Sequence, residues 1–420
     1  MLRAGFGKAD ITPSYPLELS GFAARRGKSE GVHDRIYCRA LHLEEEKEFT
    51  LISCDVLGFD VQFSDGVRQM VASRLGLSKA QVMLAATHTH SAPATMFLRH
   101  AGTVDKGYLK LVQDSILQAA EAAQETHPVT MSYAAKRVPG LTVDRVYQSA
   151  PDDSLVAIHL NPADKGEKRI SIVNFSCHPV VLGAYNKYVS ADFPGYVCSY
   201  YEREGEETIF LNGASGDLNP FTSKKHEQTG TFQDAERMGT SIAEKSYQNG
   251  KELEPSISFS DREVLLEQVR PAIEEETLER EVQAKRQRGD SIDPDTGIPY
   301  EVEAQVMEEW LSEVRSKEPG QVKAEAQALK LSQELALVSF SGELFSSVGN
   351  LVKLGSPFTE KMIVGYANGL VGYIPDQRAF EVGSYEAAEA YKYFDTFPFS
   401  KSVSKVAIKA MLIALAELNQ

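Results

Sequence analysis

Short apolar runs alternate with helical patterns over the first half of the chain. FTLISCD at 49–55 predicts a buried strand, and apolar positions three and four apart predict a helix over 64–75. A second stripe at helical spacing runs over 107–125, and His127-Pro128 ends that helix. Further strands are predicted at the start of 81–90 and at 129–138, 155–160, 169–178 and 208–215, with a helix around 233–247. The sheet content is therefore high.

The composition changes near 261–320, where acidic and basic residues dominate a mostly helical pattern. A charge-rich stretch of this kind usually forms a solvent-facing surface. We therefore expect a charged helical insertion at about 265–320, which is either mobile or lies over the mouth of a functional site.

Beyond the insertion, the pattern of apolar residues is again typical of buried strands and of a helix packed on them. Alternation at period two in 322–331 and the apolar run in 334–345 predict a hairpin, and 402–418 predicts an amphipathic helix packed on the sheet. Strands interspersed with peripheral helices indicate a mixed α/β or α+β fold. We expect one domain over 1–420 that contains the insertion.

The charge and composition of the chain exclude several classes of protein. The 44 Lys and Arg against 59 Asp and Glu give a net charge of −15, so the average surface repels nucleic acid and anionic lipid. No stretch approaches the roughly 20 apolar residues of a membrane span. The 4 cysteines form no CxxC pair, and the N-terminus contains no long apolar leader. A soluble, cytoplasmic protein is expected.

Two histidines follow the strand predicted at the start of 81–90. His88 and His90 are two positions apart in THTH, so on an extended backbone both imidazoles leave the same face. Such a pair can hold a metal ion, although two hydrogen-bonded loop histidines give the same pattern. The metal interpretation therefore depends on further ligands.

Two more candidate ligands follow predicted strands elsewhere in the chain. His178 ends the run NFSCH before Pro179, where a side chain can point into a cleft, while Cys177 would face the core. Glu343 follows a predicted strand and Gly342 in SFSGELF. The alternative to a ligand role is that Glu343 begins a helix, where the helix dipole favours an acidic residue. Two histidines and a glutamate are the ligand types of open hydrolytic zinc sites.

A series of short motifs spans nearly the whole chain. They are AGFGKADITP (4–13), SGFAARRG (20–27), GVHDRIYCRA (31–40), SCDVLG (53–58), ATHTHSAP (86–93), VDRV (143–146), CHPVVL (177–182), SADFPGY (190–196), NGASGDLNP (212–220), SGELF (341–345) and YIPDQRAFEVGSYEA (373–387). In this order they resemble the catalytic domain of the neutral/alkaline non-lysosomal ceramidases, which are zinc amidases that cleave the N-acyl bond of ceramide. The chain is most similar in length to shorter, bacterial-type relatives.

The resemblance implies a set of site residues. The zinc ligands would be His88, His178, Glu343 and Tyr373. His90 would lie beside a metal-bound water, outside the primary ligands, and would move a proton toward the leaving nitrogen. Arg145 and Tyr385 match the family's arginine and second tyrosine, which would donate hydrogen bonds to a developing oxyanion. Without the resemblance, a surface salt bridge for Arg145 and core packing for the two tyrosines would be favoured.

The turn at 216–220 departs from the family pattern. Ceramidases carry Gly-Asp-Val-Ser-Pro, whereas Asn219 stands here in place of the serine. An amide cannot serve as a nucleophile, but it can hydrogen-bond a substrate carbonyl. Ser215 is expected to pack in the turn. We also expect no immunoglobulin-like C-terminal domain of the kind that the family carries, and therefore a substrate smaller or more polar than ceramide.

Three functions are compatible with these residues. The leading one is a zinc-dependent hydrolase that cleaves an amide N-acyl bond of a small molecule by metal-activated water, with Zn²⁺ as the cofactor. The alternatives are a non-catalytic metal-binding relative and a zinc esterase or carbohydrate deacetylase. A homo-oligomer is left open. For the fold, the resemblance implies central, mostly antiparallel sheets flanked by helices, with the site at strand ends and loops.

Overall fold

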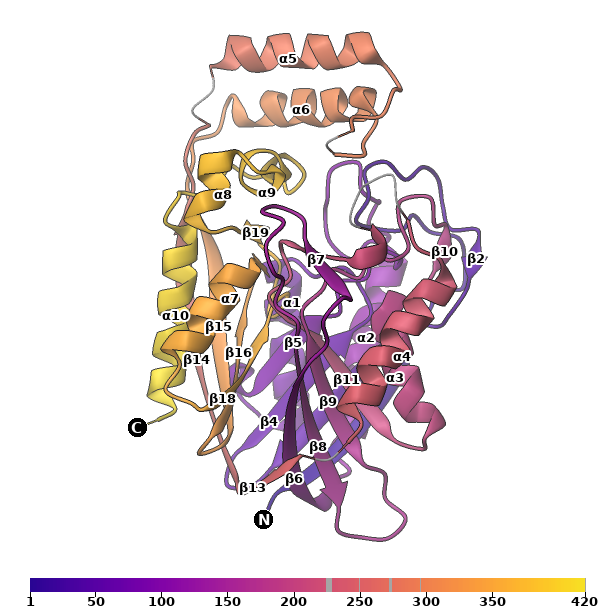
Figure 1. Ribbon diagram of the computed structural model, residues 1–420, viewed down its shortest axis with the longest axis vertical. Helices are drawn as coiled ribbons and strands as arrows, with labels where there is room; N and C mark the ends of the chain where they lie inside the picture. The colour runs from indigo at the N-terminus through magenta and orange to yellow at the C-terminus, as the bar shows by residue number, and fades with distance from the viewer. Residues whose placement is uncertain (224–228, 249, 272–273, 295, 420) are drawn as a thin grey trace.

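Two β-sheets packed face to face form the body of the structure, a computed structural model that describes all residues except 224–228, 249, 272–273, 295 and 420 (Figure 1). The larger sheet has nine strands in the order β11-β9-β8-β6-β1-β3-β4-β5, with β13 beside β6. They are β1 (Arg3–Asp10), β3 (Tyr37–Glu44), β4 (Glu48–Cys54), β5 (Val82–Ala86), β6 (His127–Arg137), β8 (Ser154–Pro162), β9 (Ile170–Phe175), β11 (Glu207–Asn212) and β13 (Lys251–Leu253). Most neighbours are antiparallel, as expected, and the parallel pairs are β4–β5 and β9–β11.

The smaller sheet comes from the second half of the chain. Its strands, in order, are β14 (Pro255–Glu267), β15 (Gln321–Ser332), β16 (Leu335–Phe340) and β18 (Glu360–Val364). The pair β15–β16 is the predicted hairpin. Three short ribbons complete the strands, namely β2 (Gly31–Val32) with β10 (Tyr188–Val189), β7 (Thr142–Asp144) with β12 (Leu218–Pro220), and β17 (Glu343–Leu344) with β19 (Tyr373–Ile374).

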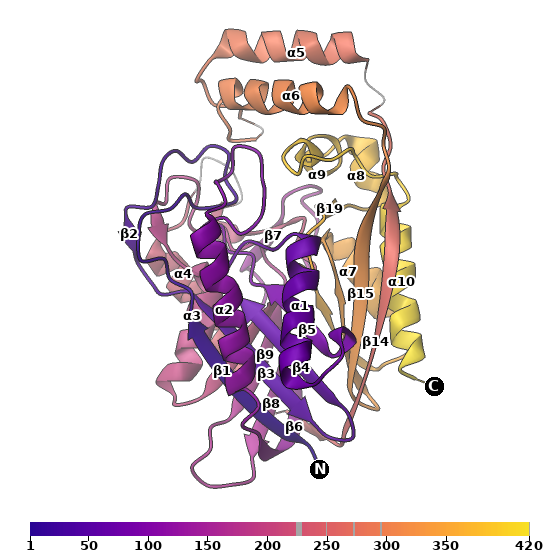
Figure 2. The same ribbon diagram turned by 180° about the vertical axis from the view of Figure 1, so that it is seen from behind.

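The hydrophobic core fills three interfaces between four layers. Between the sheets, Leu41 and Ile158 from the larger one meet Leu329 and Leu337 from the smaller one. The helices α1 (Val61–Leu75), α2 (Lys106–Ala122), α3 (Asp192–Arg203) and α4 (Phe232–Ser246) cover the outer face of the larger sheet, and α7 (Ser346–Gly355) and α10 (Val403–Glu417) cover that of the smaller sheet (Figures 1 and 2). Among the described residues, no helix combines the length and apolar character that crossing a membrane requires.

The charged segment after β14 contains two helices. Residues 265–267 still belong to β14, so the helical part begins later than expected, with α5 (Glu275–Arg288) followed by α6 (Tyr300–Val314). Both lie beyond α8 (Gln377–Val382) and α9 (Tyr385–Ala388) at one end of the molecule (Figures 1 and 2). The apolar face of α6 packs through Val302 and Val306 against Ala23, Tyr385 and Tyr393. Helix α6 therefore packs on the loop that carries Ala23 and on the start of α9 at Tyr385.

A buried ion pair connects α1 to the smaller sheet. Arg68 on α1 donates from both terminal nitrogens to the carboxylate of Glu325 on β15, at 2.9 and 2.8 Å. Its Nε donates to the carbonyl of Val82 on β5, and the Arg68 side chain is fully buried. This arginine therefore joins a helix to a strand of each sheet.

Replacing Arg68 with methionine is expected to lower the free energy of unfolding by about 3–5 kcal/mol, because the substitution leaves the Glu325 charge buried without its partner. Urea unfolding followed by circular dichroism measures the change. The double variant Arg68→Met/Glu325→Gln should recover part of the loss, since it removes the unpaired charge. Equal stability of the wild type and Arg68→Met would contradict this role.

Candidate metal centre

His88 and His90 lie in the loop that follows β5, where the chain leaves the sheet. The expectation that an extended backbone carries both side chains is wrong, because His88 has a φ of 70°. This left-handed conformation is rare outside glycine and is held here by the His88 N–H, which donates to the carbonyl of Val56 at 3.0 Å. The two imidazoles still converge, with 3.3 Å between their Nε2 atoms.

His178 and Glu343 reach the same point from other segments. His178 follows β9, and its Nε2 lies 3.1 Å from Oε2 of Glu343, the first residue of β17. The same oxygen is 3.3 Å from Nε2 of His88. The candidate ligand nitrogens of His88, His90 and His178 all lie within 4.8 Å of one another. All four side chains are buried, so the fold brings together groups that are separated by up to 255 positions in the sequence.

Backbone carbonyls fix the tautomers of two of these histidines. Nδ1 of His88 donates to the carbonyl of Leu57 at 2.7 Å, and Nδ1 of His178 donates to that of Ser215 at 2.6 Å. A carbonyl only accepts, so the Nδ1 atoms carry the protons and the lone pairs of Nε2 face the centre. Metal-binding histidines are oriented in this way in proteins. The donor set therefore fits a divalent cation such as zinc.

The charges of the cluster support the same interpretation. Burial lowers the pKa of His178 to about 4, with a further contribution from Arg145, and burial also lowers the pKa of His90. Burial opposes ionisation of Glu343, but the facing His88 and His178 hold its pKa below the usual value. Neutral imidazoles and a carboxylate are the protonation states that a metal ion requires of its ligands.

Tyr373 is placed beside the cluster by strand pairing. In the parallel ribbon of β17 and β19, Tyr373 is the register partner of Glu343. Its ring lies 6.4 Å from that of His178, nearly parallel to it. Its hydroxyl accepts a hydrogen bond from Nη2 of Arg145 at 3.1 Å. Two implied ligands from separate motifs are thus neighbours across one pair of short strands.

Arg145 forms hydrogen bonds with several residues next to Tyr373. Its Nε donates to the Glu386 carboxylate at 2.9 Å, Nη1 to Oδ1 of Asn219 at 3.0 Å, and Nη2 also to the carbonyl of Gly216 at 2.8 Å. The Asn219 amide in turn donates to the carbonyl of Ser223 at 3.2 Å. Four N–H groups of Arg145 are thus engaged by protein atoms, two of them with Tyr373 and Asn219.

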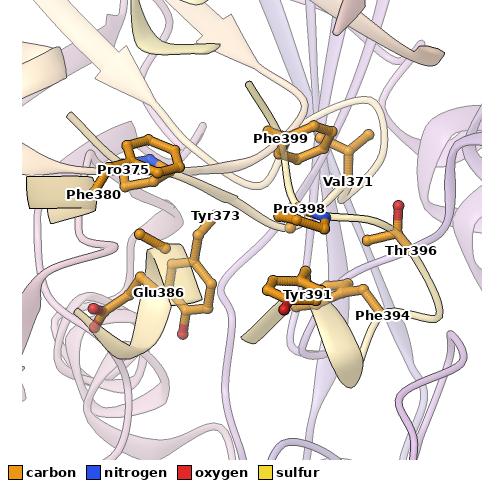
Figure 3. A pocket seen from close by; sticks show the side chains of 12 residues that line it. Val371, Tyr373, Pro375, Phe380, Glu386, Tyr391, Phe394, Thr396, Pro398 and Phe399 are labelled. Atoms are coloured by element: carbon orange, nitrogen blue, oxygen red, sulfur yellow. The ribbon is translucent and has the colours of Figure 1, made fainter. Parts of the chain in front are cut away.

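Tyr385 and a small cavity lie on the other side of Tyr373. Tyr385 begins α9, and its ring meets that of Tyr373 edge-on at 6.4 Å. The cavity holds about 20 Å³, room for roughly one water molecule. Apart from Tyr373, Glu386 and Thr396, its lining is mainly apolar and aromatic (Figure 3), with Val371, Pro375, Phe380, Tyr391, Phe394, Pro398 and Phe399. In this conformation it is too small for a lipid chain.

The structure adds two residues that the sequence did not single out. Tyr366 stacks on His88 with 4.0 Å between ring centres, and its hydroxyl is 2.8 Å from Oγ of Ser215, which packs in the turn as expected. Gly21 lies directly against His90, whose Nδ1 is buried and has no hydrogen-bond partner among the described residues. Neither residue carries a sequence signal of its own, because each acts only through a neighbour distant in the chain.

Substituting Gly21 with alanine is expected to reduce activity by about tenfold or more, since the added Cβ would lie 2.4 Å from Nδ1 of His90 and the φ of 97° strains any side chain. The rate of hydrolysis at saturating substrate measures the effect. The control is Gly27→Ala, which has a positive φ but open space around its Cβ. Equal rates for both variants would contradict a role for Gly21 in placing His90.

Comparison with known proteins agrees with this geometry. The family described as neutral/alkaline non-lysosomal ceramidase, N-terminal, matches residues 2–237, more than half of the chain. The neutral ceramidase of Pseudomonas aeruginosa is 27% identical over 252 residues, which cover 52% of this chain and 37% of that protein. The neutral ceramidase of Drosophila melanogaster is 31% identical over 103 residues, 23% of this chain and 14% of that protein. The matched stretches thus span well under half of these relatives.

The fold is shared with a solved structure of the same kind. The crystal structure of neutral ceramidase from Pseudomonas aeruginosa superposes with a TM-score of 0.76 at 18% identity, covering 100% of this chain and 74% of that chain. A ceramidase complexed with C2 gives the same TM-score at 19% identity. Together with the family match, these findings show that the chain belongs to the neutral/alkaline non-lysosomal ceramidase family.

Proposed function

We propose that this protein is a zinc-dependent hydrolase of amide N-acyl bonds that acts on a substrate smaller or more polar than ceramide. The observation that carries the proposal is the convergence of His88, His178 and Glu343, with both Nδ1 atoms committed to backbone carbonyls. The relatives named above are ceramidases, which supports an amide as the bond that is cleaved.

The residues of the centre suit this chemistry. Zinc would be held by Nε2 of His88 and His178 and the carboxylate of Glu343, with Tyr373 as the further ligand. When bound, zinc supplies Lewis acidity and lowers the pKa of water. No other buried acid is needed to complete the set, because a glutamate and two histidines already form a hydrolytic donor set.

His90 is the proposed proton carrier. Its Nε2 faces Nε2 of His88 at 3.3 Å, while its Nδ1 is shielded by Gly21. Because burial lowers its pKa, the imidazole is neutral at physiological pH and can accept a proton at Nε2. It would then return that proton to the leaving nitrogen. Tyr385 would donate to the developing oxyanion, whereas Arg145 would act by holding Tyr373.

Asn219 fits a mechanism in which water is the nucleophile. Both ends of its amide are engaged, with Arg145 and with the carbonyl of Ser223. An amide has no nucleophilic oxygen of the kind a serine would provide. Asn219 therefore supports the position of Arg145 and takes no covalent part in the reaction.

The test combines metal analysis with a substrate panel. The protein is stripped with a chelator, reconstituted with zinc and assayed on short N-acyl amines, ceramides, aryl esters and N-acetylated sugars. We expect one zinc per chain and zinc-dependent hydrolysis of amides. A protein that never holds stoichiometric metal contradicts the proposal. Turnover of esters or sugars alone supports the alternative hydrolases, and bound zinc without turnover supports a non-catalytic relative.

A further inference from the structure

Arg25 is a buried cation close to the centre, and none of the acids that the structure describes pairs with it. It lies in the loop between β1 and β2 and is 8% exposed. Nη1 donates to the carbonyls of Ser20 at 3.1 Å and His90 at 2.7 Å, and Nε donates to that of Ala184 at 3.4 Å. In the described part of the chain, no carboxylate forms an ion pair with this guanidinium. Its Nη2 is buried and makes no hydrogen bond.

An arginine in this state is unusual. Buried charges in proteins are normally paired, because carbonyl groups replace water only in part and leave the charge uncompensated. Burial is the cause that lowers the pKa of Arg25 to about 9. Three other well-buried arginines, Arg39, Arg68 and Arg99, and the partly buried Arg145 all have acidic partners. The two free N–H groups on Nη2 therefore lack an anion.

The position of Arg25 connects it to the proposed reaction. The guanidinium lies 4.9 Å from the centre of the Phe22 ring, and that ring lies 4.9 Å from the His90 ring. Arg25 also holds the backbone carbonyl of His90 directly. Arg25 is thus linked to the proposed proton carrier in two ways, through the Phe22 ring and through the backbone of His90.

We infer that Arg25 recognises an anionic group of the substrate, a carboxylate next to the scissile amide, so that the protein hydrolyses N-acyl amino acids in preference to neutral N-acyl amines. This inference rests on the proposed function and specifies its substrate class. A charge-assisted hydrogen bond from an arginine to a carboxylate is among the stronger polar contacts available in a buried site. Protein atoms cover Nη2 in this structure, so the loop at 20–27 must move to admit the ligand. That loop is held by α6 through Ala23.

The test uses two substrates that differ only in charge. N-octanoylglycine carries the carboxylate, and N-octanoylglycinamide replaces it with a neutral amide of similar size. We expect the zinc-loaded wild type to prefer the acid by roughly 10- to 100-fold in kcat/KM. Arg25→Gln should bring this ratio close to 1, while Arg26→Gln, at an exposed position in the same loop, should keep it. Arg25→Lys retains the charge and should retain part of the preference if Arg25→Gln fails to fold.

The outcomes separate this inference from the proposed function. A wild type that hydrolyses both substrates equally overturns the inference and leaves the amidase proposal standing. An Arg25→Gln variant that is slower on both substrates with an unchanged ratio also overturns it, because Arg25 would then only connect three loops. If neither substrate is hydrolysed, the proposed function fails, and calorimetry with N-octanoylglycine decides the inference. Binding that requires Arg25 supports it, and binding that is absent or independent of Arg25 overturns it.

Discussion

Replacing His178 with alanine is expected to abolish stoichiometric zinc binding and, with it, amide hydrolysis. The substitution removes the nitrogen that lies 3.1 Å from Oε2 of Glu343 and leaves the carbonyl of Ser215 without its donor. Loss of an outer partner of a metal ligand already costs about 10–100-fold in metal affinity or activity, so loss of a ligand should cost more. Zinc content after dialysis and kcat/KM on an N-acyl substrate measure the two effects.

The control is a histidine of equal burial outside the cluster. His42 on β3 is buried and its Nδ1 contacts Oγ1 of Thr50, so His42→Ala tests the general cost of removing a buried imidazole. This variant should keep one zinc per chain even if its stability falls. If His178→Ala binds zinc as tightly as His42→Ala does, the proposed ligand set is wrong.

The elements that the sequence predicted correctly are those with a local periodic signal. The strand at 49–55 and the helices at 64–75 and 107–125 correspond to β4, α1 and α2. Their apolar positions repeat with the period of the element that buries them, and Asp60 and Gly76 mark the ends of α1. The helical part of the segment expected at about 265–320 begins only at Glu275, because β14 alternates charged and apolar side chains up to Glu267 and so resembles the charged segment that follows.

The geometry of the centre could not be predicted from local patterns. The turn at His88 depends on the carbonyl of Val56, which lies in the loop after β4. The pairing of Glu343 with Tyr373 depends on a parallel ribbon whose strands are two residues long. Residue types and the order of the motifs therefore indicated which side chains form the centre. The topology of the sheets determines how these side chains come close to one another.

The contacts of Arg145 are a further feature that local patterns could not reveal. A lone arginine in VDRV indicated either an exposed salt bridge or a donor to the substrate. In the structure, 19% of its side chain is exposed, and it bonds Glu386, Asn219 and Tyr373 together with the carbonyl of Gly216. These partners come from two distant motifs, at 212–220 and 373–387, so the local motif VDRV could not show that Arg145 connects them.

The Arg145→Lys substitution is expected to lower kcat by about 100-fold with a smaller change in KM, although it preserves the charge. An ammonium cannot reproduce the planar fork that spans Glu386, Asn219 and Tyr373, so the Tyr373 phenol loses its fixed orientation beside Glu343. Removal of a single oriented donor from an active site has effects of 10²–10³-fold. Steady-state kinetics on the best substrate of the amide panel give kcat and KM separately.

The matched control is Arg137→Lys, because Arg137 is 76% exposed and pairs with the buried carboxylate of Asp153. Since the arginine of this pair faces solvent, a lysine can replace it, and this variant should leave kcat unchanged. The zinc content of Arg145→Lys should stay within twofold of the wild type, because His88, His178 and Glu343 are intact. Equal kcat values for Arg145→Lys and Arg137→Lys would show that the hydrogen bonds around Arg145 support folding alone. A lower kcat for Arg145→Lys only, at full zinc occupancy, would show that these hydrogen bonds position Tyr373.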